Sequence, residues 1–162
     1  MKSKVKPSIL LNWYDQNART MPWRIGPTDR MAGILPNPYH VWLSEIMLQQ
    51  TTVATVKSYF IKFVKKWPTL EKLAQADENE ITGAWAGLGY YARARNLLRC
   101  AKIVKSEYDG KFPTDYNTLI TLPGVGPYTA GAIAAIAYDK NEAVVDGNVE
   151  RVVSRLFNIQ TP

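Results

Sequence analysis

The sequence predicts an all-α protein, and three observations support that prediction. Apolar residues recur at the three- and four-residue spacing of a helix along most of the 162 residues. Proline and glycine interrupt the pattern at short intervals, which is typical of short helices joined by turns. No segment alternates apolar and polar residues over the length of a strand, and the three residues 143–145 are expected to form only an extended connection.

Composition narrows the class of protein further. The chain has 20 Lys and Arg against 14 Asp and Glu, a net charge of +6, and an isoelectric point near 9.4. This balance favours a polyanionic partner, with nucleic acid first. A hydrophobic share of 46% is enough to build a core and excludes general disorder. The longest apolar run, residues 131–138, is far shorter than the ~20 residues that cross a bilayer, so we expect no membrane partner.

Cysteine usage indicates the compartment. Cys100 is the only cysteine, which excludes an internal disulfide, a zinc site or an iron–sulfur cluster built from this chain alone. The opening residues 1–7 are basic, but no apolar signal region follows them. We therefore expect a reducing, cytoplasmic location.

The first half of the chain is expected to hold helices on either side of one irregular segment. A short amphipathic helix over 8–18 is predicted, with Ile9, Leu10, Trp13 and Tyr14 on one side. The segment 21–38 is rich in Pro and Gly and is expected to form no regular element. Helices are predicted over 41–50 and over 53–67, the second ending at Pro68.

The second half is also predicted to be helical. Thr69 and Asp77 are expected to cap two short helices. Further helices are predicted over 91–108 and 114–120. Residues 128–138 are almost uniformly small and apolar, which predicts a helix buried on all sides. The last helix carries an apolar stripe formed by Val149, Val152, Val153, Leu156 and Phe157.

The apolar stripe of the last helix needs something to cover it. Only five residues follow Phe157, and the earlier helices are the only elements left to pack on it. We therefore expect the chain to be the front part of a longer protein.

The turn at residues 122–126, Leu-Pro-Gly-Val-Gly, lies between two predicted helices. Its two glycines permit a tight turn and leave backbone amides free at the start of the next helix, where an anion can bind. Val125 is expected to point inward. The alternative, from the turn alone, is a plain helix connection in which the glycines act as C-caps.

Four motifs occur in the order found in one family. They are WR at 23–24 with PY at 38–39, LSEIMLQQT at 43–51, GLGYYARARN at 87–96, and LPGVGPYTAG at 122–131 followed by VDGNVER at 145–151. Together they resemble the helix–hairpin–helix (HhH-GPD) base-excision DNA glycosylases, and within them the members specific for adenine. The resemblance covers about residues 10–157.

The resemblance implies both the fold and the reaction. It implies the six-helix core of those glycosylases. The implied reaction is hydrolysis of the bond between adenine and deoxyribose, where the adenine is mispaired with 8-oxoguanine or guanine. The adenine is flipped out of the DNA helix before the bond breaks. The partner is then double-stranded DNA containing that mispair, and we expect a monomer in the bacterial cytoplasm, associated with the nucleoid. Family members also carry a [4Fe–4S] cluster on four cysteines, whose ligands are absent from this chain.

These implications divide the chain into parts. We expect an N-terminal helix over 1–20 that belongs to an incomplete cluster-side domain, and a loop over 21–38. The six-helix domain is expected over 39–140, with the helix–hairpin–helix at 114–138. Residues 141–162 are expected to hold the aspartate loop and the start of a second helical domain. Residues 31–37 resemble an insertion of no assigned role.

Glu45 is the candidate general acid. Breaking a glycosidic bond requires protonation of the leaving group and a negative charge beside the cationic sugar. Trp42, Leu43, Ile46 and Leu48 flank Glu45, so burial is expected to raise its pKa. From spacing alone, the alternative is a first-turn residue that complements the helix dipole.

Asp146 is the candidate partner carboxylate. By resemblance, Asp146 stabilises the oxocarbenium-like sugar or bonds to it transiently, and Asn148 orients the site. Asp146 lies 20 residues after Gly126, which matches the family spacing. The alternative is an ordinary helix N-cap. Asn148 is expected to compete for that capping position and so to release Asp146.

Tyr128 distinguishes two kinds of glycosylase. By resemblance, the endonuclease III-like relatives have lysine at this position, and its amine forms a Schiff base that leads to strand cleavage. A tyrosine cannot form one, which favours a monofunctional enzyme. The alternative for Tyr128 is an aromatic residue in the core.

The remaining candidates contact DNA or the base. By resemblance, Gln50 and Tyr90 fill the gap left by the flipped base, with Leu48 nearby, and Gly124, Val125 and Gly126 grip a phosphate. Arg93 and Arg95 are candidates for further phosphate contacts. Trp23 and Arg24 are assigned to the base pocket.

Two other classes of function stay open on the sequence. One is an endonuclease III-like bifunctional pyrimidine glycosylase and lyase, which Tyr128 and Glu45 disfavour. The other is a non-catalytic helix–hairpin–helix DNA-binding module or an inactive fragment, which needs the turn but neither carboxylate.

Overall fold

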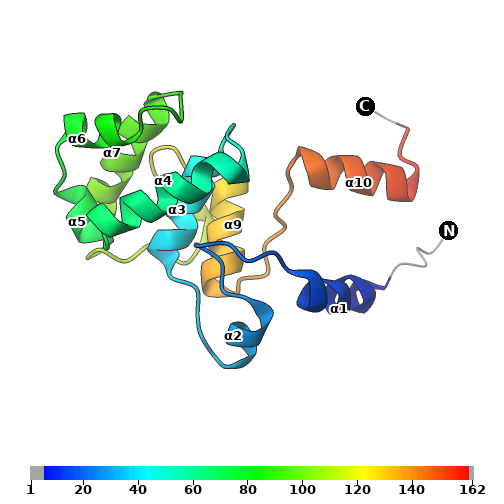
Figure 1. The fold of residues 1–162 in the computed structure, drawn as a ribbon. Coiled ribbons are helices and arrows are strands. Elements are labelled where there is room, and N and C mark those ends of the chain that lie inside the picture. Colours follow the sequence, from blue (N-terminus) through cyan, green and yellow to red (C-terminus); the bar gives the residue numbers. More distant parts are fainter. Residues whose placement is uncertain (1–5, 161–162) are drawn as a thin grey trace.

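The computed structural model describes residues 6–160 and is helical throughout them, with no strand in that range (Figure 1). Residues 1–5 of the basic opening and the last two residues of the expected 141–162 unit lie outside the described residues. The helices are α1 (Pro7–Asn17), α2 (Pro27–Met31), α3 (Pro38–Leu48), α4 (Val53–Lys66), α5 (Leu70–Ala74), α6 (Glu78–Ala84), α7 (Ala92–Glu107), α8 (Tyr116–Leu119), α9 (Pro127–Tyr138) and α10 (Gly147–Phe157).

Local capping explains where several helices begin. The Thr69 side chain accepts from the Lys72 amide at the start of α5, as the sequence predicts. Asp77 caps α6 in a reciprocal arrangement with Glu80. Asn37 accepts from the Tyr39 amide at 2.9 Å, and Pro38 occupies the first turn of α3, where the missing N–H has no cost.

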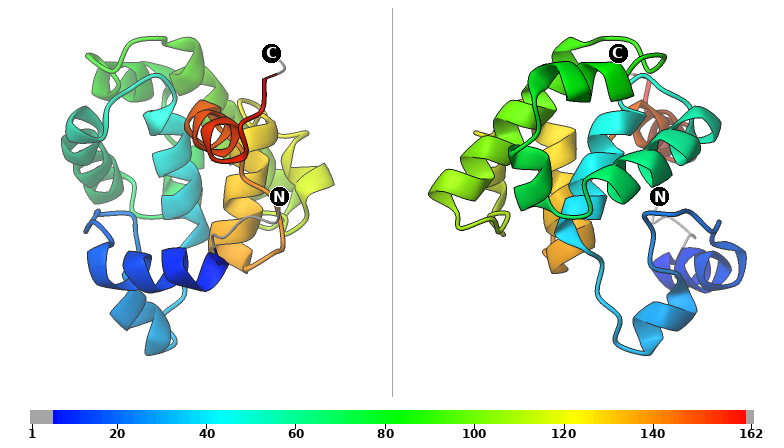
Figure 2. Two further views of the ribbon diagram at one scale, coloured as in Figure 1. Left: turned by 90° about the vertical axis from the view of Figure 1, so that its right-hand side faces the viewer. Right: turned by 60° about the vertical axis from the view of Figure 1, so that its left-hand side comes forward.

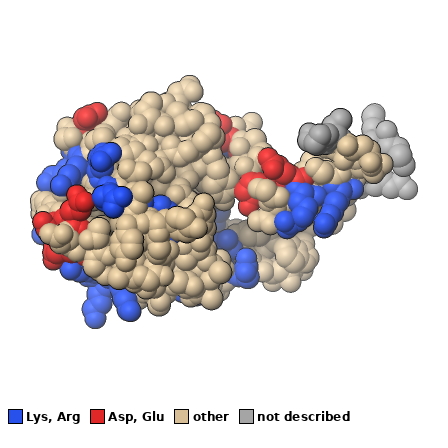
Figure 3. Space-filling view, turned by 90° about the horizontal axis from the view of Figure 1, so that it is seen from above, with Lys and Arg blue, Asp and Glu red and all other residues tan. Residues whose placement is uncertain are grey.

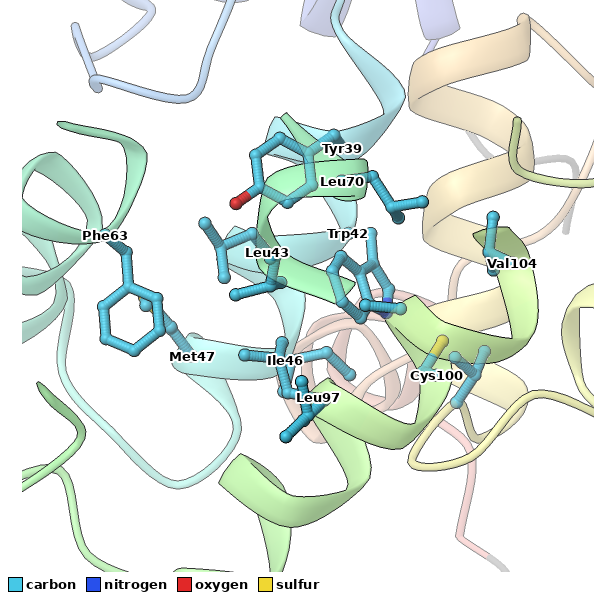
Figure 4. Close-up of a cluster of buried hydrophobic side chains, with 14 of the residues drawn as sticks. Tyr39, Trp42, Leu43, Ile46, Met47, Phe63, Leu70, Leu97, Cys100 and Val104 are labelled. Atoms are coloured by element: carbon cyan, nitrogen blue, oxygen red, sulfur yellow. The ribbon is translucent and has the colours of Figure 1, made fainter. Parts of the chain in front are cut away.

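The core is built around α3, which packs against α4, α7 and α9. Trp42, Leu43 and Met47 of α3 are fully buried. Figure 4 shows them with Phe63 of α4 and residues of α7, including Cys100. Close packing against three helices limits the movement of α3 itself.

Three expectations about the helices are corrected. The segment 21–38 contains a short helix, α2, which was not predicted because the segment is rich in Pro and Gly. The helix expected at 41–50 begins three residues earlier, at Pro38, which places Glu45 in its second turn. The helix at 127–138 is buried only over residues 129–134, since Tyr128 and Ile136 at its two ends are each about two-fifths exposed.

Helices α1 and α10 project from the same side of the body (Figures 1 and 2). Neither contains a buried residue. The stripe on α10 is exposed along its length, as is the apolar side of α1, so the other helices of residues 6–160 do not cover either face.

Charge is distributed unevenly over the surface. On the face shown in Figure 3, Lys and Arg gather at the end of the body opposite α10 and again along α10 itself, with Asp and Glu among them. The net charge of +6 therefore does not form one continuous basic face on this side. Within residues 6–160, no helix combines the length and the apolar character that a membrane span requires.

Candidate active site

Glu45 lies in the wall of a cavity of about 190 Å³. The cavity is formed where α3 meets the 21–38 segment and the end of α9, and its lining residues are Tyr14, Trp23, Arg24, Ile25, Arg30, Pro36, Val41, Ser44, Glu45 and Ile136. The two residues assigned to the base pocket from the sequence, Trp23 and Arg24, are thus brought together with the candidate acid. Trp23 is held there by an edge-to-face contact with Phe60 of α4.

Burial controls the acidity of Glu45. It raises the pKa of the Glu45 carboxyl from 4.5 to about 7, because the charged form loses its hydration between α3 and its neighbours. Interactions with the Tyr128 hydroxyl and the Arg24 charge act in the opposite direction but do not overcome it. Glu45 is therefore protonated in a large fraction of molecules at neutral pH. The alternative of a first-turn dipole partner no longer applies, since α3 starts at Pro38.

Tyr128 lies close enough to both candidate carboxylates, Glu45 and Asp146, for their charges to affect its pKa. It stands in the first turn of α9, partly exposed, and its hydroxyl interacts with Glu45. Burial, the charge of Glu45 and the charge of Asp146 together raise the pKa of Tyr128 to about 12. The phenol is therefore neutral at all physiological pH values and lies within electrostatic range of both acids.

Asp146 is the N-cap of α10. Its carboxylate accepts from the backbone amides of Asn148 and Val149 at 3.0 and 2.8 Å, and these bonds hold its pKa below the usual range. The expectation that Asn148 competes for the cap is wrong: the Asn148 side chain donates to Asp146 at 3.0 Å and accepts from Arg151 at 2.7 Å. Asp146 thus combines the capping role with a partly exposed, ionised carboxylate.

The hairpin between α8 and α9 has the geometry of an anion site. Gly124 has φ of +76°, and a β-carbon there would approach that of Asn96 to 3.1 Å, so this position requires glycine. Val125 is buried, as expected. Gly126 is the N-cap of α9 without a side-chain acceptor, and the first helical bond is made by the Ala130 amide. The earlier amides have no partner within the helix, and so the turn presents donors to an anion.

The structure adds Gln49 to this hairpin. Its side-chain amide donates to the Gly124 carbonyl at 3.4 Å and to the Thr129 hydroxyl at 3.3 Å, which connects the end of α3 to both sides of the turn. The sequence offered one signal for this residue, namely the adjacent pair Gln49-Gln50, of which only Gln50 was assigned a role.

The residues assigned to DNA contact occupy different environments. Gln50 and Tyr90 are exposed, each in the left-handed backbone region, with φ of 56° and 49°. Leu48, the last residue of α3, is half-buried and packs against the core. Arg95 is exposed on α7.

Arg93 does not have the free guanidinium that was expected. Both terminal nitrogens donate to backbone carbonyls and to Thr51 within the protein. The prediction that Arg93 contacts phosphate is therefore corrected, because the group is already committed inside the fold.

The residues present do not fit an iron–sulfur cluster. Cys100, the sole cysteine, is buried beside Trp42, and burial raises its thiol pKa to about 12, whereas cluster ligands must be thiolates. No group of three or more metal-binding side chains occurs in the part of the chain that the structure describes.

A hairpin with free amide donors, a buried acid and an ionised aspartate on an all-α frame are features of a base-excision type of protein. Residues 43–162 match the model of the HhH-GPD superfamily of base excision DNA repair proteins, and the chain belongs to that superfamily.

Three relatives carry the same curated name, adenine DNA glycosylase. The chain is 44% identical over 160 residues to that of Buchnera aphidicola subsp. Baizongia pistaciae, 51% over 148 residues to that of Homo sapiens, and 43% over 151 residues to that of Mycolicibacterium smegmatis. These matches cover 98%, 91% and 93% of this chain but 43%, 27% and 49% of the relatives. The chain therefore spans less than half the length of each.

Solved structures support the same fold. A thermostable thymine-DNA glycosylase superposes with a TM-score of 0.78 at 31% identity, covering 91% of this chain and 64% of the other. A non-covalent endonuclease III–DNA complex superposes with a TM-score of 0.69 at 23% identity, covering 93% and 69%. The expected helix–hairpin–helix glycosylase fold is confirmed.

Proposed function

We propose that the protein is a monofunctional adenine DNA glycosylase, acting on adenine mispaired with 8-oxoguanine or guanine in double-stranded DNA. The observation that carries the proposal is a pair of carboxyl groups with opposite pKa shifts. Burial raises the pKa of Glu45 to about 7, and hydrogen bonds lower the pKa of Asp146 below its usual range. Such a divergence assigns an acid and a base to different tasks. The curated name of the relatives supports adenine as the base.

In the proposed reaction, Glu45 transfers its proton to a ring nitrogen of the flipped adenine. The bond between that base and the sugar carbon then breaks, and its electron pair leaves with the adenine. The ionised Asp146 stabilises the positive charge that develops on the sugar. Water adds to the sugar carbon and loses a proton to a carboxylate, which leaves free adenine and an abasic site.

The proposed binding mode assigns the hairpin to a phosphate and the cavity to the base. Gly124, Val125 and Gly126 offer backbone donors to the DNA strand, while Gln50 and Tyr90 take the place of the flipped base. Trp23 and Arg24 line the cavity that receives it. We propose a monomer that works on the bacterial nucleoid.

A second candidate function has a specific observation in its favour. The thymine-DNA glycosylase structure is 31% identical to this chain, so thymine in DNA is the competing substrate. A lyase reaction is disfavoured, because Tyr128 has no amine to form a Schiff base.

One experiment separates these functions. The protein is incubated in excess with duplexes that differ in a single pair: A opposite 8-oxoguanine, A opposite G, or T opposite G. The proposal predicts release of free adenine and a strand that breaks only after hot alkali. Release of thymine, or a borohydride-trapped protein–DNA adduct as the main product, would overturn it.

A further inference from the structure

Gln50 and Tyr90 share an unusual backbone conformation. Both are non-glycine residues with positive φ, 56° and 49°, and they lie on separate loops, after α3 and before α7. A left-handed residue with a long side chain is strained and persists only where its surroundings fix it. Both side chains are nevertheless exposed, so packing of the side chains does not supply that constraint.

The constraint comes from hydrogen bonds to the backbone, and one guanidinium group reaches both loops. Each loop also has a local bond: the Thr51 hydroxyl donates to the Gln49 carbonyl at 3.3 Å, and the Trp85 indole N–H donates to the Gly89 carbonyl at 3.1 Å. Arg93 donates from one terminal nitrogen to the carbonyls at the end of α3 and from the other to the loop before α7. Its acceptors are the carbonyls of Ile46 (3.2 Å), Met47 (3.0 Å), Gln49, Leu88 (2.8 Å) and Gly89 (3.1 Å), and the Thr51 hydroxyl (3.1 Å).

Two of these acceptors explain the strained residues directly. The Gln49 carbonyl belongs to the peptide group that leads into Gln50, and the Gly89 carbonyl belongs to the peptide group that leads into Tyr90. Arg93 therefore fixes the orientation of both peptide planes at once. The guanidinium also lies near the Tyr90 ring, with its central carbon 5.8 Å from the ring centroid.

We propose that Arg93 is a positioning residue that holds Gln50 and Tyr90 as one preformed unit for entry into the DNA. The inference rests on the proposed function, in which these two residues replace the flipped base. With both loops tied to a single group, neither has to be ordered when DNA binds, so the cost of ordering is met during folding.

An arginine fits this task better than other residues. Its planar fork carries two terminal nitrogens that can serve two loops simultaneously, whereas the single ammonium of lysine cannot span both. No carboxylate bonds to Arg93 in the described residues. Its charge is balanced instead by carbonyls from the last turn of α3, the negative end of that helix. A residue required only for packing would not need this charge.

The test compares Arg93→Lys and Thr51→Val with wild type and with a control, Lys102→Met, which removes a charge from the exposed side of the same helix. Thr51→Val deletes one acceptor of the guanidinium, together with the hydroxyl's own bond to the Gln49 carbonyl, and leaves the charge. It keeps the proposal testable if Arg93→Lys is poorly folded, because only the bond to Arg93 links Thr51 to residues 87–91. The first measurement is hydrogen exchange in the free protein. Arg93→Lys is expected to accelerate exchange in residues 49–52 and 87–91 together, with residues 129–134 unchanged.

The second measurement is base flipping, followed by the fluorescence of 2-aminopurine placed at the target position, together with excision. Arg93→Lys is expected to reduce the flipped fraction and to slow excision about 10- to 100-fold. Its affinity for undamaged duplex, which needs only the hairpin, is expected to stay within about 3-fold of wild type. Thr51→Val is expected to show the same changes to a smaller degree, and Lys102→Met none.

The outcomes are distinct. Faster exchange in only one of the two loops, in neither, or equally throughout the core would overturn the proposal. A loss of affinity for undamaged duplex as large as the loss of excision would also overturn it, by making Arg93 a phosphate contact. If the wild-type protein itself does not flip or release adenine, the proposed function fails, while the exchange experiment still decides whether Arg93 couples the loops.

Discussion

Tyr128 interacts with Glu45 across the contact between α9 and α3, and each residue shifts the acidity of the other. The phenol lowers the pKa of Glu45 against the larger effect of burial, which leaves that pKa at about 7. The carboxyl group in turn helps raise the pKa of Tyr128 to about 12. Tyr128 is thus a neutral partner that weakens, without cancelling, the effect of burial on the pKa of Glu45.

The first prediction concerns the pH dependence of excision. Only protonated Glu45 can serve as the acid, and its pKa is raised, so the protonated form is present below about pH 7 and is lost above it. The single-turnover rate is expected to fall about tenfold per pH unit on the alkaline side. A rate that is constant, or that rises, between neutral and alkaline pH would remove Glu45 from the role of acid.

The second prediction concerns Tyr128→Phe. The substitution removes the hydroxyl that lowers the pKa of Glu45, so that pKa is expected to rise above 7. The alkaline fall in rate should therefore move to higher pH, while the strand stays intact after excision. Tyr108→Phe, in the cap of α7 away from the cavity, is the matched control and should leave the profile in place. An unchanged profile in Tyr128→Phe would show that the phenol does not control Glu45.

The sequence was sufficient to predict every helix of residues 6–160 except α2, because apolar spacing and caps are local signals. Thr69 and Asp77 cap the helices that they were expected to cap. The sequence was a less reliable guide where proline and glycine, which usually break helices, occur at a helix start. Pro and Gly indicated an irregular loop over 21–38, yet the first turn of a helix accepts proline without cost, and α2 starts at Pro27.

For the candidate site, sequence reasoning named residues that the structure places in one cavity, but it did not predict the environment of each side chain. Motifs identify which residues belong to a site, and Trp23, Arg24 and Glu45 do line one cavity. A motif does not say whether an arginine points outward or inward. Arg93 was therefore expected to contact phosphate, although it bonds carbonyls at the end of α3, which is distant in the sequence, and in the loop directly before α7.

The third prediction separates the two roles of Asp146. Asparagine is also a good N-cap, so Asp146→Asn keeps the start of α10 but removes the negative charge. Asp146→Ala removes both. Asp146→Asn is expected to lose most excision with α10 intact, as judged by amide exchange at residues 148–150. Excision near the wild-type rate in Asp146→Asn would leave Asp146 a structural cap alone.

The fourth prediction concerns the mobility of α10. Its apolar stripe is exposed and none of its residues is buried, whereas residues 129–134 of α9 are buried throughout. Exchange of backbone hydrogens is expected to be fast in α10 and slow in α9 when this chain is studied alone. Equal protection of the two helices would show that α10 does not need a further covering surface.

The central claim is that Glu45 supplies the proton for base release, and Glu45→Gln tests it most directly. Glutamine has nearly the same shape but no transferable proton. The free energy of unfolding of the Glu45→Gln variant is expected to exceed that of wild type by about 3 kcal/mol above pH 7. The reason is that the raised pKa makes ionised Glu45 destabilising in that pH range. Any loss of activity is then not a loss of folding.

The decisive measurement is single-turnover release of adenine from a duplex with one A opposite 8-oxoguanine, with duplex affinity measured in parallel. The account predicts that Glu45→Gln binds the duplex within about 3-fold of wild type, because the phosphate contacts are intact. Release of adenine should be slower by about 100- to 10,000-fold. Release at a rate close to that of wild type would contradict the account.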